Sequence, residues 1–253
     1  MLGKPRSTHK EEKPHNLIYV CLGTGILWFG WYGFNGGSSI TSTARGAMAA
    51  VVTTLAASTG ALAWMLMDFL KTRKYSAIAF CGGAVSGLVA VTPAAGYIAP
   101  WAAIIIGTTA GIVCRAGCRL KLLLKIDDSL DAFGVHGVGG LWGSVLTGIF
   151  AQNWVAALDG STISPGWVDG NWIQIGYQIA GAVVIAAWSF FVSLALLFLI
   201  NKIPGFDLRP SEEYASLGND PLELGEYSCD YFMSIEKKSE MLLKNDSIET
   251  VMA

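Results

Sequence analysis

The stretch at residues 127–151, DDSLDAFGVHGVGGLWGSVLTGIFA, begins with acidic side chains and continues as an apolar run rich in glycine. The run is about 20 residues long, the length of α-helix that crosses the hydrocarbon core of a bilayer. It contains a single ionisable ring, the imidazole of His136. An ionisable residue inside a membrane span indicates a functional site. The alternative is a neutral imidazole that is hydrogen-bonded to a neighbouring helix.

The composition of the whole chain is typical of a membrane protein. Of its 253 residues, 53% are hydrophobic and only 14% are charged, against roughly 25% charged in soluble domains. The long apolar runs do not alternate with polar residues as the strands of a β-barrel do. We therefore predict an all-α, polytopic transmembrane helix bundle with six spans. They lie near residues 17–38, 46–70, 76–98, 100–118, 132–151 and 172–200.

The basic residues predict how this bundle is oriented. Of the 17 Lys and Arg residues, only Arg45 falls in a segment that alternating spans would place on the outer side. The positive-inside rule then puts both termini in the cytosol. We expect a short cytosolic N-terminal segment (1–16), a membrane domain (17–202) and a cytosolic tail (203–253) that holds 11 acidic and 4 basic residues.

The sequence argues against several classes of function. The spans contain no paired carboxylates on one membrane-embedded face, no nucleophile beside a base and no phosphate-binding glycine loop, so we do not expect an enzyme. Cys114 and Cys118 lie one helical turn apart without further ligands, so we expect no metal site and no other cofactor. The basic residues are dispersed and the tail is acidic, which argues against binding to nucleic acid.

Several residues have a structural role by prediction. Asp128 and Asp131 precede the apolar run, where a carboxylate caps the first free amides and is favoured by the helix dipole. Pro93 and Pro100 predict a break between two spans. Small residues at four-residue spacing predict that helix backbones approach closely. These pairs are Gly33 with Gly37, Gly83 with Gly87, Gly107 with Gly111, and Gly139 with Gly143.

Three stretches carry a resemblance to a known family. Residues 127–151 resemble the tenth transmembrane helix of the Amt/Mep/Rh ammonium transporter family, and ILWFGWYGFNGGSS (26–39) resembles the sixth. Between them, GGAVSGLVAVTPAAGYIAPWAAIIIG (82–107) resembles the region of the eighth and ninth helices. The resemblance implies the last six helices of an eleven-helix inverted repeat. It also implies transport of ammonium or ammonia, with methylammonium as a further substrate, through an apolar pore.

The resemblance also assigns roles to individual side chains. His136 matches the second member of a twin-histidine pair that lines the pore, and Trp31 matches a pore-lining tryptophan. Phe34 matches one of two phenylalanines that gate the outer mouth, and Ser38 matches the hydroxyl that recruits ammonium. On sequence pattern alone, residues such as Trp31 and Phe34 are more often packing aromatics, and one such as Ser38 is more often a helix-end hydroxyl.

The same resemblance implies that this chain holds half of the family's pore. The first twin histidine, the other gate phenylalanine, and the aromatic and acidic residues of the recruitment site have no counterpart in it. We expect a truncated product of a full transporter gene, trimeric and in the plasma membrane, and a lone copy without a closed pore. The alternative is a non-transporting ammonium sensor or regulatory subunit that assembles with complete homologues, or an inactive fragment. Residues 205–232 resemble the C-terminal region through which the family regulates conduction, so cytosolic regulators of the tail are possible partners.

Overall fold

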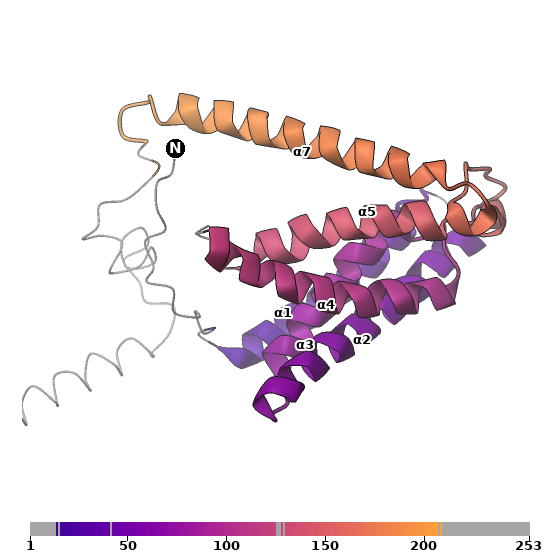
Figure 1. Cartoon of the computed structure of the whole chain (residues 1–253), viewed down its shortest axis with the longest axis horizontal. Coiled ribbons are helices and arrows are strands. Elements are labelled where there is room, and N and C mark those ends of the chain that lie inside the picture. Colours follow the sequence, from indigo (N-terminus) through magenta and orange to yellow (C-terminus); the bar gives the residue numbers. More distant parts are fainter. Residues whose placement is uncertain are drawn as a thin grey trace, which may run out of the picture.

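The computed structural model describes residues 14, 16–40, 42–124, 128, 130–206 and 208, and within these ranges every regular element is helical (Figure 1). Six helical segments are long and apolar enough to cross a membrane, which confirms the predicted all-α bundle. They are α1 (Leu17–Gly37), α2 (Ala44–Thr72), α3 (Ala77–Val91), α4 (Pro100–Leu124), the π-helical turn η2 (Phe133–Val138) continued by α5 (Gly139–Phe150), and α7 (Ile173–Ile200). Short elements join them: η1 (Thr92–Ala94), α6 (Asn153–Ala156), η3 (Ala157–Asp159) and η4 (Trp167–Asp169).

The ends of these helices follow from local chemistry. The Asn16 side chain caps α1 by accepting hydrogen bonds from two first-turn amides, and Ser76 Oγ accepts one from Ala79 N at the start of α3. Such caps satisfy amides that have no partner within the helix. The predicted break lies after Val91, and α4 begins at Pro100, where the missing N–H of proline costs nothing.

The backbones of α2, α3 and α4 meet at glycines. A Cβ atom added to Gly87 would lie 2.1 Å from the carbonyl oxygen of Ala56, and one added to Gly107 would lie 2.2 Å from the same oxygen. A Cβ atom added to Gly83 or Gly111 would likewise lie 2.4 or 2.6 Å from the carbonyl oxygen of Gly60. The predicted close packing at these pairs is therefore confirmed, and only glycine fits at these contacts.

The other two predicted glycine pairs differ from one another. Gly143 approaches the carbonyl oxygen of Ala90, and Gly139 approaches the sulfur of Cys114, so this pair also packs as predicted. By contrast, a Cβ atom on Gly33 or Gly37 would meet no described atom within 4 Å. The prediction of close packing is wrong for these two glycines within this chain, because their side of α1 faces no other described helix.

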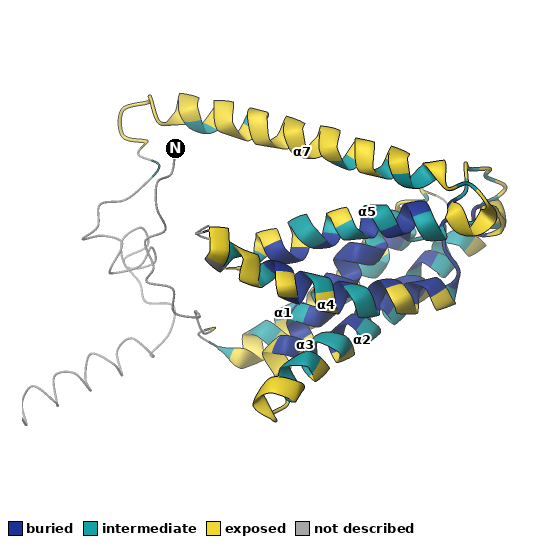
Figure 2. Ribbon diagram, viewed as in Figure 1, coloured by how far each residue is buried: buried dark blue, intermediate teal, exposed yellow. Residues whose placement is uncertain are grey.

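Burial is concentrated in the middle helices (Figure 2). The core consists largely of alanine, valine and isoleucine from α2, α3 and α4. The only buried residues of α1 are polar, Thr24 and Asn35. Helix α7 has no buried residue and contacts mainly α5 and η4. Large apolar side chains therefore cover the outside of α1 and α7, as expected of surfaces that face lipid or further protein.

Helix α4 continues past the predicted end at residue 118 and reaches Leu124. Near this end the helix also contains a buried ion pair: Arg115, which is 7% exposed, donates from Nε to Asp68 Oδ1 of α2 at 2.6 Å. A charge that is paired in this way can lie within a helix. Arg119 and Lys121, which follow the predicted end of the span, also lie on α4.

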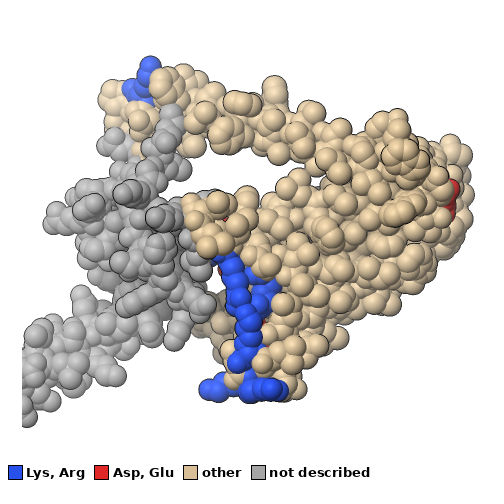
Figure 3. Space-filling view, viewed as in Figure 1, with Lys and Arg blue, Asp and Glu red and all other residues tan. Residues whose placement is uncertain are grey.

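The segments between helices lie at two ends of the bundle. At one end, Arg45 Nε forms an ion pair with Asp159 Oδ2 at 2.9 Å, and the Arg45 guanidinium lies over the Tyr97 ring at 5.1 Å from its centroid. Hydrogen bonding from Ser161 and the charge of Arg45 hold the pKa of Asp159 below its usual value. At the other end, Lys and Arg side chains gather where α2 and α4 finish (Figure 3).

We predict that Gly87→Ala destabilises the protein. The new Cβ would lie 2.1 Å from a backbone oxygen, and overpacking of this kind costs about 1–3 kcal/mol. The free energy of unfolding in detergent measures the effect. Gly33→Ala is the matched control, since it is also within a helix but has open space around it. Equal effects of the two substitutions would contradict the close approach of α2 and α3.

Candidate pore-lining site

Three of the predicted site residues lie together at the end of α1. The rings of Trp31 and Phe34 make an edge-to-face contact, with centroids 5.9 Å apart and planes at 77°. Ser38 Oγ donates a hydrogen bond to the Phe34 carbonyl oxygen, which leaves the lone pairs of the hydroxyl free to accept. Trp31 Nε1 donates to Thr92 Oγ1 of η1 at 2.8 Å. Phe34 is 59% exposed. The group thus combines aromatic faces with a hydrogen-bond acceptor, a combination that suits a small cation.

A buried polar contact sets which face of α1 is turned inward. Asn35 Nδ2 donates to Thr53 Oγ1 of α2 at 2.8 Å, and both residues are buried. Thr53 Oγ1 donates in turn to the Ala49 carbonyl oxygen at 2.6 Å. This contact draws Asn35 toward α2 and leaves the neighbouring Phe34 outside. Neither Asn35 nor Thr53 was predicted as a site residue, although polar side chains inside apolar spans are a usable signal.

His136 lies on the π-helical turn η2, which precedes α5. Turns of this kind are rare and occur often at functional sites. The imidazole is exposed, whereas its neighbours Gly134 and Val135 are buried. Among the described helices, none covers the imidazole. The imidazole can therefore contact groups that lie outside the core of this chain.

The two acids before this turn have different contacts. Asp128 accepts hydrogen bonds from the amides of Ala132 and Phe133, both at 2.9 Å, so its carboxylate caps the start of the turn. Asp131 has a left-handed backbone with φ of 56° and forms an ion pair with Lys121 Nζ of α4 at 2.7 Å. Its carboxylate makes no cap, which differs from the role we expected of it.

The structure does not join all the predicted residues into one site. Within the described ranges, no hydrogen bond or ring contact links His136 to Trp31, Phe34 or Ser38. Both groups instead pack on α3, since α1 and η2 each contact that helix. Ser38 can accept a hydrogen bond from a ligand, and the rings of Trp31 and Phe34 can stack against it. A neutral imidazole can both donate and accept a proton.

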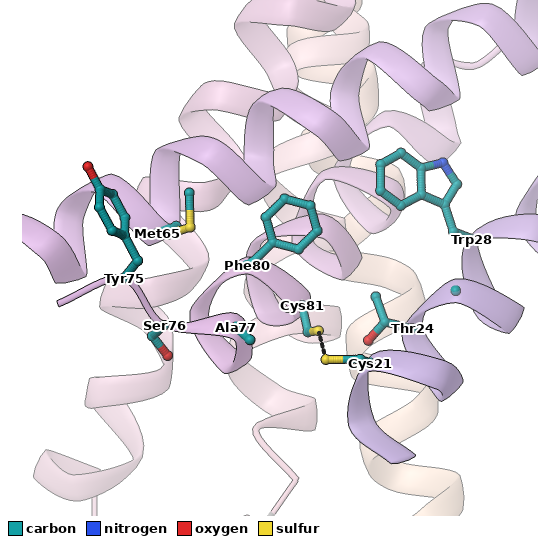
Figure 4. Close-up of a pocket in the computed structure, with 10 residues that line it drawn as sticks. Cys21, Thr24, Trp28, Met65, Tyr75, Ser76, Ala77, Phe80 and Cys81 are labelled. Carbon is teal, nitrogen blue, oxygen red and sulfur yellow. Dashed lines mark hydrogen bonds between the residues drawn. The ribbon is translucent and has the colours of Figure 1, made fainter. Parts of the chain in front are cut away.

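A separate hollow lies between α1, the end of α2 and the start of α3 (Figure 4). Its volume is about 480 Å³, and none of the predicted site residues lines it. Its wall includes Cys21 and Cys81, whose sulfur atoms are 3.9 Å apart. The cysteines described by the structure are free thiols. Among the described residues, no three His, Cys, Asp or Glu side chains gather in a way that could hold a metal ion.

The chain is similar to known transporters over almost its full length. The sequence profile of the Ammonium Transporter Family matches residues 1–228. Ammonium transporter 1 of Schizosaccharomyces pombe is 52% identical over 235 residues, which are 91% of this chain and 47% of the relative. The crystal structure of Candida albicans Mep2 superposes with a TM-score of 0.79 at 44% identity, over 84% of this chain and 48% of Mep2.

A solved structure described as a sensor Amt protein is also similar, with a TM-score of 0.74 at 28% identity, over 90% of this chain and 55% of that one. The chain spans about half the length of the curated relatives that it matches. The six apolar helices and these similarities agree with one another. The chain is therefore an integral membrane protein that belongs to the Ammonium Transporter Family.

Proposed function

We propose that this chain supplies one half of a pore that conducts ammonium or ammonia across the plasma membrane. The observation that carries the proposal is the exposed imidazole of His136 on a π-helical turn within an apolar span. An ionisable side chain in such a segment is costly unless it faces a pathway or a partner. His136 has no cover from the described helices, so further helices must complete its surroundings.

The group on α1 supports the same proposal. Phe34 and Ser38 are exposed, and Gly33 and Gly37 next to them have open space around them. These residues therefore share with His136 the property that their own chain leaves them uncovered. We infer that the helices which complete the pore lie against these residues, and that a complete transporter contains them. The chain alone would have no closed pore.

The proposed mechanism follows from the cost of moving a cation into an apolar pore. Full transfer of such an ion to low dielectric costs of order 20 kcal/mol in the idealised case, and losing a proton at the mouth removes most of that cost. Ser38 Oγ would accept a hydrogen bond from ammonium beside the faces of Trp31 and Phe34. His136 would then accept a hydrogen bond or a proton inside the pore. Potassium can neither lose a proton nor donate a hydrogen bond, so it is excluded.

We further infer how the transporter assembles. We propose a homotrimer, or an assembly with complete homologues. The similarity to ammonium transporters of about twice this length supports an assembly that supplies the other half. Methylammonium is expected to follow the same path as ammonium. Most of the expected tail (203–253) and most of the N-terminal segment (1–16) lie outside the described residues. Regulation through cytosolic partners of the tail is thus part of the proposal only.

A second function, sensing without transport, is supported by the similarity to the sensor Amt protein. A sensor would use the same ammonium-recruiting group on α1 but would need no continuous path past His136. The two functions therefore differ in whether substrate crosses the membrane and in whether His136 is needed.

We predict that the chain alone gives no methylammonium uptake in cells that lack their own transporters. Uptake should appear when the chain is joined to the five preceding spans of a close relative such as Ammonium transporter 1. In that joined protein, His136→Ala should reduce uptake by about a hundredfold, since removing a positioned proton-handling group costs 10²–10⁴-fold. Radiolabelled methylammonium uptake measures both effects, and His9→Ala is the matched control.

Uptake by the chain alone would contradict the incomplete pore. Uptake by the joined protein that survives His136→Ala would contradict the role of the imidazole. If the joined protein binds ammonium and reaches the cell surface but moves none, the sensor is the correct function.

We also predict that the basic end of the bundle faces the cytosol. In a chain whose five cysteines are replaced, Thr162→Cys should react with a membrane-impermeant maleimide in intact cells, because Thr162 is exposed at the opposite end. Lys74→Cys, which is also exposed, should react only after the membrane is opened. The positive-inside rule predicts this orientation, with the basic end of the bundle in the cytosol. The reverse pattern of labelling would overturn the orientation.

A further inference from the structure

We propose that Lys121 is a positioning residue for His136: it fixes the π-helical turn that determines where the imidazole points. The importance of this for transport rests on the proposed function of His136. The positioning itself can be measured without any transport.

Lys121 contacts the segment before the turn at two points. Its Nζ donates a hydrogen bond to the Asp128 carbonyl oxygen at 2.7 Å and forms an ion pair with Asp131 Oδ1, also at 2.7 Å. The Lys121 side chain is 22% exposed, so the ion pair is partly shielded from water. A partly buried ammonium with two oxygen partners holds them more firmly than a surface ion pair does. Lys121 thus joins the last turn of α4 to the start of η2.

The two acceptors of Lys121 lie where the chain reverses into the turn. Asp131 has φ of 56°, a left-handed conformation that non-glycine residues rarely adopt and that Asp tolerates better than most. The Asp131 carbonyl oxygen accepts a hydrogen bond from Val135 N at 2.9 Å, in the residue next to His136. The Asp128 carboxylate holds the amides of Ala132 and Phe133. A short chain of contacts therefore leads from the Lys121 ammonium to the backbone of Val135, the residue before His136.

Helix α4 also holds the buried side of the turn. A Cβ atom added to Gly134 would lie 2.5 Å from Cys118 Sγ and 2.6 Å from Cys118 N, so the two backbones are in close contact. Cys114 Sγ lies 3.8 Å from the Val135 carbonyl oxygen and is placed to donate to it. Packing thus fixes how near η2 lies to α4, while Lys121 is the charged contact that fixes where η2 begins.

Removing the Lys121 ammonium has a clear physical consequence. The Asp131 carboxylate would lose its cation, and the Asp128 carbonyl oxygen would lose the ammonium that donates to it. The strained backbone at Asp131 would lose the partner that maintains it, and such geometry persists only when the surroundings impose it. A π-helical turn is less favourable than a regular α-turn, so the segment would re-form its hydrogen bonds and the imidazole would turn.

The test uses His136 as its own reporter. The chain has three histidines, so His9→Gln with His15→Gln leaves His136 as the only one. In lipid nanodiscs, the nitrogen NMR shifts of its ring report its hydrogen bonding, and the rate of reaction with diethyl pyrocarbonate reports its accessibility. We expect Lys121→Met to move both ring-nitrogen shifts and to change the rate of reaction with diethyl pyrocarbonate, because the imidazole would lie in a new position.

Two further variants control the result. Lys121→Arg keeps the charge and should retain the wild-type shifts and rate. Lys71→Met removes an exposed lysine at the same end of the bundle and should change neither. If Lys121→Met does not fold, Asp131→Asn removes only the charge of the partner and should move the shifts in its place. Unchanged shifts and rate in Lys121→Met, or an equal change in Lys71→Met, would overturn the proposal.

Transport is measured separately in the joined protein. Lys121→Met should lower methylammonium uptake there if His136 handles the substrate. A moved His136 signal with unchanged uptake would leave the positioning intact and would contradict the proposed function of the imidazole. An unmoved signal with lost uptake would overturn the positioning.

Discussion

The close contact between the backbones of α2, α3 and α4 is the constraint on which the rest of the structure depends. In lipid there is no hydrophobic gain when two apolar helices meet, so association relies on dispersion and on polar contacts between surfaces that fit. The Ala56 carbonyl oxygen lies where side chains on both Gly87 and Gly107 would have to be, so one peptide group contacts two other helices. Any larger residue there would separate the helices on which α1 and η2 pack.

On this apolar core, single polar contacts set the rotation of each outer element. Asn35 bonds to Thr53 between α1 and α2, Arg115 pairs with Asp68 between α4 and α2, and Trp142 Nε1 donates to Thr109 Oγ1 at 3.0 Å between α5 and α4. Dispersion tolerates rotation about a helix axis, whereas a hydrogen bond does not. Small residues therefore fix how near the helices lie, and polar side chains fix which way the helices face.

The sequence predicts the coarse architecture well and the local geometry poorly. The spans were predictable because a run of apolar residues is a property of one segment alone. The burial of Arg115 within α4 was not, because it depends on a carboxylate 47 residues earlier. The left-handed backbone of Asp131, whose carboxylate pairs with Lys121 of α4, was also not predictable from the residues next to it. Gly33 and Gly37 have the same spacing as the packed glycines, so spacing alone cannot tell whether a partner helix is present.

The candidate site shows the same limit. The family resemblance assigned His136, Trp31, Phe34 and Ser38 from their motifs, and the structure adds the contacts that hold the α1 group together. Their exposure could not be inferred from hydropathy, because these motifs have the same hydropathy as ordinary apolar spans. What an apolar residue faces, whether core, lipid or a pathway, is decided by the helices around it.

The π-helical turn also determines where the length of this segment can change. Its hydrogen bonds join residues five apart, one more than in a regular α-helix. Deleting one residue between Phe133 and Val138 and making the turn regular would therefore leave α5 facing nearly the same way, with Gly139 still against Cys114 and Gly143 against Ala90. Deleting one residue between Gly139 and Gly143 would instead turn the rest of α5 by about 100° and take Gly143 away from Ala90. A one-residue deletion should therefore be tolerated within the turn but not within α5.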